Sequence, residues 1–148
     1  MQSIFFHVPM EPKGAPRPRV TRDGRAYMPA GYVKWKEAFA EEAARSMPCA
    51  TKPWWPEQRL ELHTEVRVRM PKSWSRAKRR AELGRGIAQR PDVDNCQKSI
   101  MDALIGVAYA DDSQIYAESY ERRWTQGESY IAVQLKCEDP PNDDGHDE

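Results

Sequence analysis

Apolar and polar residues alternate along several segments of the chain. The longest alternation covers residues 60–70, where every second side chain is apolar or threonine and the side chains between them are charged or histidine. A period of two is typical of a β-strand with one buried face. Residues 4–8, 114–124 and 128–136 are shorter segments of this kind and predict three further strands. A turn at Gln126-Gly127 separates the last two, so we expect them to pair as a hairpin.

Two segments repeat their apolar residues with the period of an α-helix. Residues 32–47 carry a stripe at spacings of three and four, made of Tyr32, Trp35, Phe39, Ala43 and Met47. The stripe predicts an amphipathic helix with one side facing the core. Residues 75–83 combine helix-forming residues with a strongly basic face, and Gly84 and Gly86 end that helix.

A third helix is expected after Pro91, because proline disfavours a helix at the residue before it. Asp92 is then expected in an extended or turning segment, and Asp94 at the cap of a helix that runs to about Gly106. The apolar stripe of this helix is Ile100, Ala103, Leu104 and Val107. A different face carries Asp94, Lys98 and Asp102 at spacings of four.

The connecting segments are rich in turn-forming residues. Residues 11–31 contain proline and glycine too often for a helix or a central strand, so we expect a long loop with at most one small ribbon. Trp54 and Trp55 lie between prolines on another loop, where they either pack against the core or stack on a base, and burial preferences favour packing. These elements together predict a small single α/β domain with a mixed β-sheet packed against helices.

Composition excludes several classes of protein. No apolar run approaches the roughly 20 residues that cross a bilayer, so no membrane span is expected, and residues 1–10 do not have the features of a secretory signal. The three cysteines, Cys49, Cys96 and Cys137, form no CxxC pair and leave one thiol unpaired in any disulfide scheme, which favours a reducing cytoplasm. The three histidines are also scattered, so a structural zinc site is not expected.

Charge is unevenly distributed along the chain, although the formal net charge is zero. Residues 138–148 hold six acidic residues and no lysine or arginine, which predicts a disordered acidic tail after a domain formed by residues 1–137. That domain carries a net charge of +6. Residues 13–25 hold five basic residues against one acid, and residues 72–90 hold seven against one. Each basic segment is either a solvated surface or a contact surface for a polyanion such as DNA.

Acidic residues gather after the second basic segment. Asp92 and Asp94 open the third helix, and Asp111 and Asp112 follow it, so a short return of the chain can bring the two pairs together. Carboxylate oxygens are hard ligands that suit Mg²⁺, which keeps several waters and takes few protein ligands. The alternative is structural, because caps and turns also recruit aspartate and Lys98 can pair with a neighbouring carboxylate. The spacing alone leaves both interpretations open.

Two common motifs are excluded. A calcium loop of the EF-hand type that starts at Asp92 would need glycine where Gln97 stands and glutamate where Ala103 stands. The chain also contains no GxxxxGK[ST] loop of the kind that cradles nucleotide phosphates.

Four motifs follow one another in a specific order: GAPRPRVTRDGRAYMP, MPKSWSRAKRRA, RPDVDNCQKSIMDAL and YADDSQI. In this combination the chain resembles, from Ile4 to about Trp124, the RusA family of Holliday-junction resolvases, small phage and prophage endonucleases. The resemblance implies an α/β fold and an endodeoxyribonuclease that uses Mg²⁺, or Mn²⁺ in its place, in the bacterial cytoplasm. It also implies a homodimer that binds four-way junctions and cuts paired strands symmetrically, and two-fold symmetry suits such a substrate.

The resemblance implies roles for individual residues. Asp92, Asp94 and Asp112 are the expected metal ligands, and with Lys98 they are the expected catalytic residues. Lys98 would neutralise charge that develops on the phosphoryl oxygens. Asp102 and Asp111 are expected to support them. DNA contacts are expected from the two basic segments, through Arg17, Arg19, Arg22, Lys72, Arg76, Lys78, Arg79 and Arg80.

Some features depart from the family pattern. The family often has lysine between Gly14 and Pro16, where this chain has Ala15, so that side chain offers no phosphate contact. The segment around Trp54 and the acidic tail look like additions, and the tail would compete with DNA for the basic surface. Two other functions stay open: a catalytically inactive protein that binds branched DNA, and a metal-dependent nucleotide phosphotransferase.

Overall fold

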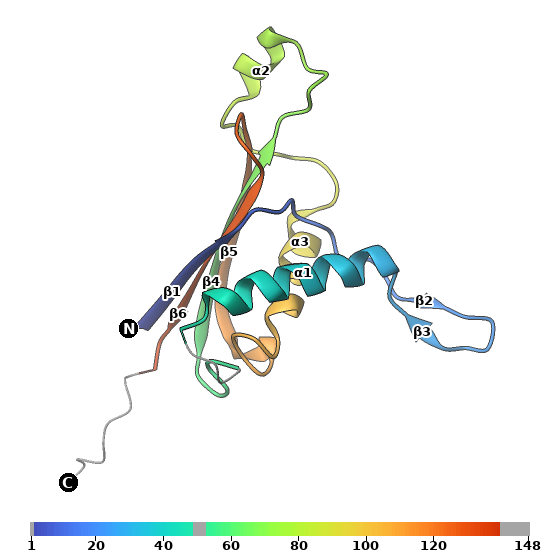
Figure 1. Cartoon of the computed structure of the whole chain (residues 1–148), viewed down its shortest axis with the longest axis vertical. Coiled ribbons are helices and arrows are strands. Elements are labelled where there is room, and N and C mark those ends of the chain that lie inside the picture. Colours follow the sequence, from blue (N-terminus) through green and yellow to red (C-terminus); the bar gives the residue numbers. More distant parts are fainter. Residues whose placement is uncertain (1, 49–52, 140–148) are drawn as a thin grey trace.

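The computed structural model of the protein describes residues 2–48 and 53–139. Its elements, in chain order, are β1 (Gln2–Val8), β2 (Arg19–Val20), β3 (Ala26–Tyr27), α1 (Ala30–Ser46), β4 (Leu60–Arg69), α2 (Arg76–Glu82), α3 (Val93–Leu104), the single 3-10 turn η1 (Asp112–Gln114), β5 (Ile115–Thr125) and β6 (Tyr130–Cys137). Four strands form one sheet and β2 pairs with β3 in a separate ribbon (Figure 1). The expected α/β class and the four expected strands are confirmed.

The main sheet is mixed, with the strand order β1-β6-β4-β5. β6 pairs antiparallel with both β1 and β4, whereas β4 and β5 run parallel. Parallel neighbours need a long crossover connection, and the segment that holds α2 and α3 provides it. This crossover, which joins the end of β4 to the start of β5, carries Asp92 and Asp94.

The expected hairpin between the last two strands is wrong, because β4 lies between β5 and β6. The backbone N–H of Met70 donates to the carbonyl of Thr125 at 3.0 Å, and that of Arg69 donates to the hydroxyl of Ser129 at 2.8 Å. The end of β4 therefore occupies the space between the two strands. A turn fixes only that the chain reverses its direction; it does not fix which strands pair. With β4 inserted, both edges of β4 are hydrogen-bonded, and more backbone groups are satisfied than in a hairpin of β5 and β6 alone.

Both expected long helices pack on one face of this sheet. α1 buries Tyr32, Phe39 and Ala43, and α3 buries Ile100, Ala103 and Leu104, as their stripes predicted. Phe39 and Ala43 of α1 and the three buried residues of α3 meet the inward residues of β4, such as Leu62 and Val66, in one core. Trp55 is 3 % exposed in this core and Trp54 packs against it, so the expected packing of this pair is confirmed.

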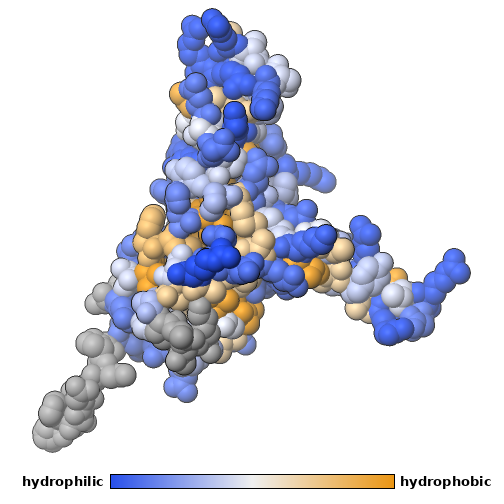
Figure 2. Space-filling view, viewed as in Figure 1, coloured by the Kyte–Doolittle hydropathy of each residue, from blue (hydrophilic) through white to orange (hydrophobic). Residues whose placement is uncertain are grey.

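Two elements project from the body (Figure 1). The β2–β3 ribbon is the small ribbon expected within residues 11–31. α2 stands on a second, smaller core formed by Met70, Ile87 and Trp124. Ser75 caps this helix, and, as expected, Gly84 follows it, with a φ of +79°, a conformation that glycine adopts readily. Figure 2 shows that both projections are predominantly hydrophilic at their tips.

The remaining sequence expectations concern the thiols, the tail and the membrane. Cys96 and Cys137 are free and buried, whereas Cys49 lies outside the described residues. The tail is described only at its first two residues, where Asp139 accepts hydrogen bonds from Arg59 and the N–H of Glu138 donates to the Arg59 carbonyl. The domain boundary at residue 137 stays a prediction. Within the described residues, no helix has the length and apolar character that crossing a membrane requires.

Candidate metal and DNA-binding site

The first pair of predicted metal ligands lies at the start of α3. Asp92 is the N-cap, and its Oδ1 accepts a hydrogen bond from the backbone N–H of Asn95 at 3.0 Å. The expectation that Asp94 caps the helix is therefore wrong. Asp92 is the last residue with extended backbone angles, φ −73° and ψ 165°, which is the conformation a capping residue needs. Asp94 lies exposed in the first helical turn, so its carboxylate is free of the capping role.

The face of α3 that begins at Asp94 carries Lys98 one turn later and Asp102 two turns later, and these two form a charged pair. Lys98 Nζ lies 3.9 Å from Asp102 Oδ2, and the Lys98 side chain is 63 % exposed. Tyr32 of α1 donates its hydroxyl to the same Asp102 oxygen at 3.4 Å. Burial raises the pKa of Tyr32, and the charge of Asp102 raises it further. Asp102 thus connects an accessible lysine to a buried tyrosine.

The second acidic pair forms the tight turn before β5. Asp111 caps η1 by accepting from the backbone N–H of Ser113 at 3.0 Å, and Gln114 completes a reciprocal capping box. The side-chain amide of Gln114 also donates to the carbonyls of Trp55 and Gln58, at 2.9 Å each, which ties the turn to the preceding loop. The Ser113 N–H lowers the pKa of Asp111. Asp111 therefore fixes the turn that presents its neighbour Asp112.

Asp112 interacts electrostatically with the charged pair on α3. Burial raises the pKa of the Asp112 carboxyl, the neighbouring carboxylates of Asp111 and Asp102 raise it further, and Lys98 opposes them. Residues from two motifs, Lys98 and Asp102 from one and Asp112 from the other, thus influence one another electrostatically. A concentration of negative charge of this kind favours a cation.

Convergence of all three predicted ligands stays a prediction. Within residues 2–48 and 53–139, no three histidine, cysteine, aspartate or glutamate side chains lie close enough to share a metal ion. Asp112 influences Asp102, which is eight residues beyond Asp94 on α3, and eight residues correspond to about 12 Å along a helix. The chemistry of the donor set nevertheless fits Mg²⁺, because every candidate ligand is a carboxylate oxygen near exposed surface.

Sequence reasoning missed the residue that holds the segment before Asp92. Arg122 of β5 is only 7 % exposed, and its guanidinium donates to the carbonyls of Ile87 at 3.2 Å, Pro91 at 2.5 Å and Gln89. The signal was present in the strand itself, because Arg122 occupies an inward position between Tyr120 and Trp124. A cation at a core-facing position needs polar partners, and here the main chain of the loop before Asp92 supplies them.

The basic residues predicted to contact DNA fall into two groups. Arg17, Arg19 and Arg22 lie on or beside the exposed ribbon, and Lys72, Arg76 and Arg80 lie exposed on or beside α2; within the described part of the chain none of these six has an ion pair or side-chain hydrogen bond. Arg79 differs, since it donates to the carbonyls of Pro71 and Trp74. Lys78 Nζ lies 4.4 Å from the centre of the Trp74 ring. Arg79 and Lys78 therefore help to hold α2 on the body.

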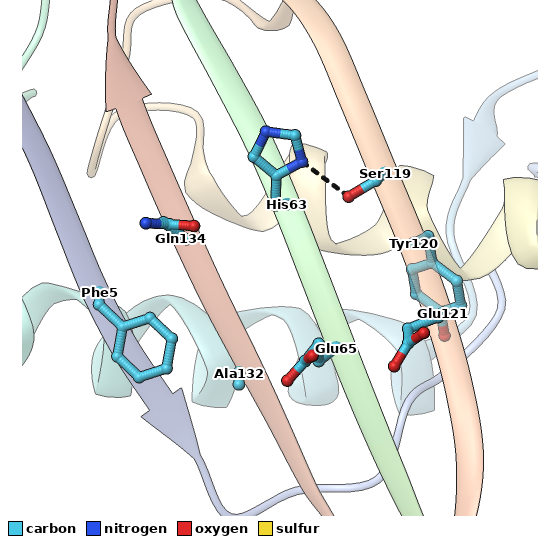
Figure 3. A pocket seen from close by; sticks show the side chains of 8 residues that line it. All are labelled: Phe5, His63, Glu65, Ser119, Tyr120, Glu121, Ala132 and Gln134. Atoms are coloured by element: carbon cyan, nitrogen blue, oxygen red, sulfur yellow. Dashed lines mark hydrogen bonds between the residues drawn. The ribbon is translucent and has the colours of Figure 1, made fainter. Parts of the chain in front are cut away.

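A basin of about 520 Å³ lies on the sheet face that points away from the helices (Figure 3). His63 there contacts Ser119 Oγ through Nδ1 at 2.7 Å and Glu61 Oε1 through Nε2 at 2.9 Å, which lowers the pKa of Glu61. A serine, a histidine and a glutamate in series suggest nucleophilic catalysis. All residues that line the basin belong to strands, however, and no helix start or loop there aims two backbone N–H groups at an oxyanion. We assign it no hydrolytic role.

Comparison with known proteins agrees with the family that the order of motifs indicates. Residues 9–136 match the family described as Endodeoxyribonuclease RusA. The chain is also similar to a protein of Bacillus subtilis (strain 168) described as the uncharacterized protein YqaN, with 35 % identity over 124 residues, which is 78 % of this chain and 83 % of the relative. The family match includes the segment from β4 to β5 that carries the acidic residues and Lys98.

Proposed function

This chain belongs to the RusA endodeoxyribonuclease family, and from that premise we propose that it is a Mg²⁺-dependent endonuclease that binds four-way DNA junctions and cuts two paired strands symmetrically. The observation that carries the proposal is the neighbourhood of Lys98, Asp102 and Asp112 on the face of α3 that begins at Asp94. It combines acidic groups with an accessible lysine, which is the composition that phosphodiester hydrolysis requires.

Asp92, Asp94 and Asp112 would hold the metal. When bound, Mg²⁺ supplies a Lewis acid that polarises the phosphate and lowers the pKa of a coordinated water, and Mn²⁺ supplies the same chemistry. Lys98 neutralises charge on the non-bridging phosphate oxygens. Asp102 and Tyr32 restrict the lysine side chain, since the carboxylate of Asp102 contacts both. Asp111 fixes the turn that presents Asp112.

The two basic projections would hold the DNA. Their free cations, Arg17, Arg19, Arg22, Lys72, Arg76 and Arg80, contact phosphates and govern affinity in a salt-dependent way. The ribbon and α2 extend from different parts of the body (Figure 1). Two separated basic arms suit a branched substrate, whose duplexes leave the branch point in different directions.

The enzyme would act as a homodimer, because a four-way junction has approximate two-fold symmetry and needs two cuts. The open sheet face would meet the second copy. Phe5 is 67 % exposed there, and successive rows across the face carry first Glu65 and Glu121, then Arg67 and Arg123. A two-fold axis between these rows would set the acidic row of each copy against the basic row of its partner. Sedimentation of the wild type as a dimer and of Phe5→Asp as a monomer would support this arrangement, and a monomeric wild type would overturn it.

The decisive experiment compares a mobile four-way junction, a linear duplex and a flap, each incubated with the purified protein in Mg²⁺ or EDTA. We expect paired, symmetric cuts in the junction with Mg²⁺ and none with EDTA. The Asp94→Asn variant should bind the junction like the wild type and leave it uncut, whereas Glu37→Gln, which alters an exposed acid on α1, should cut normally.

Each competing function predicts a different outcome of this experiment. Junction binding without cutting in any divalent metal would identify an inactive binding protein. Phosphate transfer from a nucleotide with no action on DNA would identify a phosphotransferase. Equal cutting of linear duplex and junction would remove the junction specificity and leave only the nuclease.

A further inference from the structure

An open pocket of about 520 Å³ lies between the loop after β1, the start of α1 and the start of α3. Its lining includes Lys13, Gly14, Arg19, Tyr32, Pro91 and Asn95. Asn95 directly follows the predicted metal ligand Asp94, so the pocket opens beside the acidic motif. The loop that forms its other wall comes from the opposite end of the chain.

That loop is held in place by contacts with three elements. The indole N–H of Trp35 in α1 donates to the carbonyl of Glu11 at 2.8 Å. The hydroxyl of Ser129, just before β6, donates to the Glu11 carboxylate at 3.0 Å. The backbone N–H of Ala15 donates to the carbonyl of Asn95 in α3 at 3.1 Å. The pocket is therefore built by the fold before any ligand arrives.

Gly14 allows the loop to approach α3 this closely. A Cβ atom at Gly14 would lie 2.6 Å from Cβ of Pro91, much closer than two carbon atoms can pack. Pro91 is the residue whose carbonyl Arg122 holds from the other side. The segment that leads into Asp92 is thus enclosed between the N-terminal loop and β5.

The polar groups of the pocket select for an anion. Lys13 and Arg19 are exposed and have no ion pair or side-chain hydrogen bond within the described residues. The side-chain amide of Asn95 likewise has no hydrogen-bond partner there. No aspartate or glutamate lines the pocket. Two cations and an amide donor without a competing carboxylate match the oxygens of a phosphodiester.

Tyr32 connects the pocket to the candidate catalytic groups. Tyr32 lines the pocket, and its hydroxyl reaches Asp102, the partner of Lys98. Prolines and the tyrosine ring supply apolar surface beside the cations, and a deoxyribose offers the matching apolar face. A DNA strand cut at the acidic motif would therefore continue into this pocket.

We propose that the pocket binds the phosphodiester next to the scissile one on the same DNA strand, through Lys13, Arg19 and Asn95. This rests on the proposed endonuclease function. Lys13 is the most consequential new contact. The family often has a lysine at position 15, but Ala15, which lines the same pocket, carries no charge, so Lys13 supplies the positive charge there. The subsite would set which phosphate reaches the metal, since a phosphate held on one side fixes the register of the strand.

The test uses the full-length protein and a four-way junction in EDTA, where binding is separated from cutting. Lys13→Ala should weaken binding about fivefold to tenfold and reduce the slope of log affinity against log salt by about one, as loss of one phosphate contact does. Lys13→Arg should restore both. Lys34→Ala is the matched control, because Lys34 is an exposed lysine of α1 that does not line the pocket, and its affinity should change less than twofold.

Single methylphosphonates, which remove the charge of one phosphate, then locate the contact. A methylphosphonate adjacent to the cut site should weaken binding by the wild type, and Lys13→Ala should lose no further affinity at that position. Unchanged affinity of Lys13→Ala, or a loss that adds fully to that of the methylphosphonate, would overturn the subsite. If the wild type cuts no DNA in Mg²⁺, yet a methylphosphonate at one backbone position of the junction gives this non-additive pattern, the nuclease proposal fails and the phosphate site stands.

Discussion

The guanidinium of Arg122 donates to the carbonyl of Pro91 at 2.5 Å, from a side chain that is almost fully buried. This contact joins the middle of β5 to the residue immediately before Asp92. With two further carbonyls bound by the same guanidinium, the loop from Ile87 to Pro91 cannot move independently of the sheet. A later element, β5, which follows α3 in the chain, therefore fixes the position of the start of α3.

Replacement of Arg122 by methionine should destabilise the fold. It leaves three carbonyls in a largely buried region without their donor, and we expect a loss of about 3 kcal/mol in the free energy of unfolding. Urea denaturation measures it. The stability of Arg122→Lys should lie between those of the wild type and Arg122→Met, because an ammonium group cannot reach all three carbonyls. Arg45→Met is the control: Arg45 is 62 % exposed, and its loss should change stability by less than about 1 kcal/mol. Equal effects of the two methionine variants would contradict the structural role of Arg122.

The Gly14→Ala substitution should displace the N-terminal loop from α3. The added methyl group would meet backbone-linked atoms of Pro91 at 2.6 Å, and overpacking of this kind costs about 1–3 kcal/mol. Thermal denaturation should show a lowered midpoint and the junction affinity should fall as well. Gly127→Ala is the control, because nothing lies within 4 Å of the position a Cβ would take there. A Gly14→Ala protein with the stability of Gly127→Ala would show that the loop does not pack as described.

The Lys98→Ala substitution should reduce cutting far more than binding. The lysine is 63 % exposed, so its removal leaves the fold intact. If it neutralises charge on the reacting phosphate, the single-turnover rate in Mg²⁺ should fall about 100-fold or more, while junction affinity in EDTA changes a few-fold. The two measurements together decide the matter: a rate that falls only in proportion to the affinity would reduce Lys98 to a binding residue.

The Asp112→Asn substitution should stabilise the metal-free protein at neutral pH. Burial and neighbouring carboxylates raise the folded-state pKa of Asp112 above the ordinary value of 3.8. A group with a raised pKa binds its proton more tightly in the folded state, so its stability contribution is full below pH 3.8 and is lost as pH rises through the folded pKa. The asparagine variant does not have this loss, so its melting temperature at neutral pH should exceed that of the wild type. The difference between the two melting temperatures should approach zero in acid.

Metal addition gives the complementary result. Mg²⁺ should raise the melting temperature of the wild type, because a ligand that binds only the folded state stabilises it. The same addition should have little effect on Asp112→Asn. A variant that melts below the wild type at every pH without metal would show that the Asp112 charge does not destabilise the fold.

Much of the architecture follows from local patterns. The alternation over residues 60–70 and the helical stripe of α1 both mark elements that the structure contains, because burial of one face produces a short-range period that is visible without any partner. The end of α2 before Gly84 and the packing of Trp54 and Trp55 follow from equally local chemistry. The order of motifs around Lys98 also identified the family that residues 9–136 match.

Long-range relationships were decided only by the tertiary structure. The insertion of β4 between β5 and β6 depends on which edges pair, and a turn at Gln126 constrains only direction. The cap at Asp92 rather than Asp94 depends on where the preceding loop is held, and Arg122, thirty residues later, holds it. The nearness of Asp112 to Asp102 arises in the same way, because residues on separate elements meet only through packing. The sequence by itself thus determined which chemical groups the protein carries and on which elements they lie, and the packing of the sheet and helices decided which of those groups face one another.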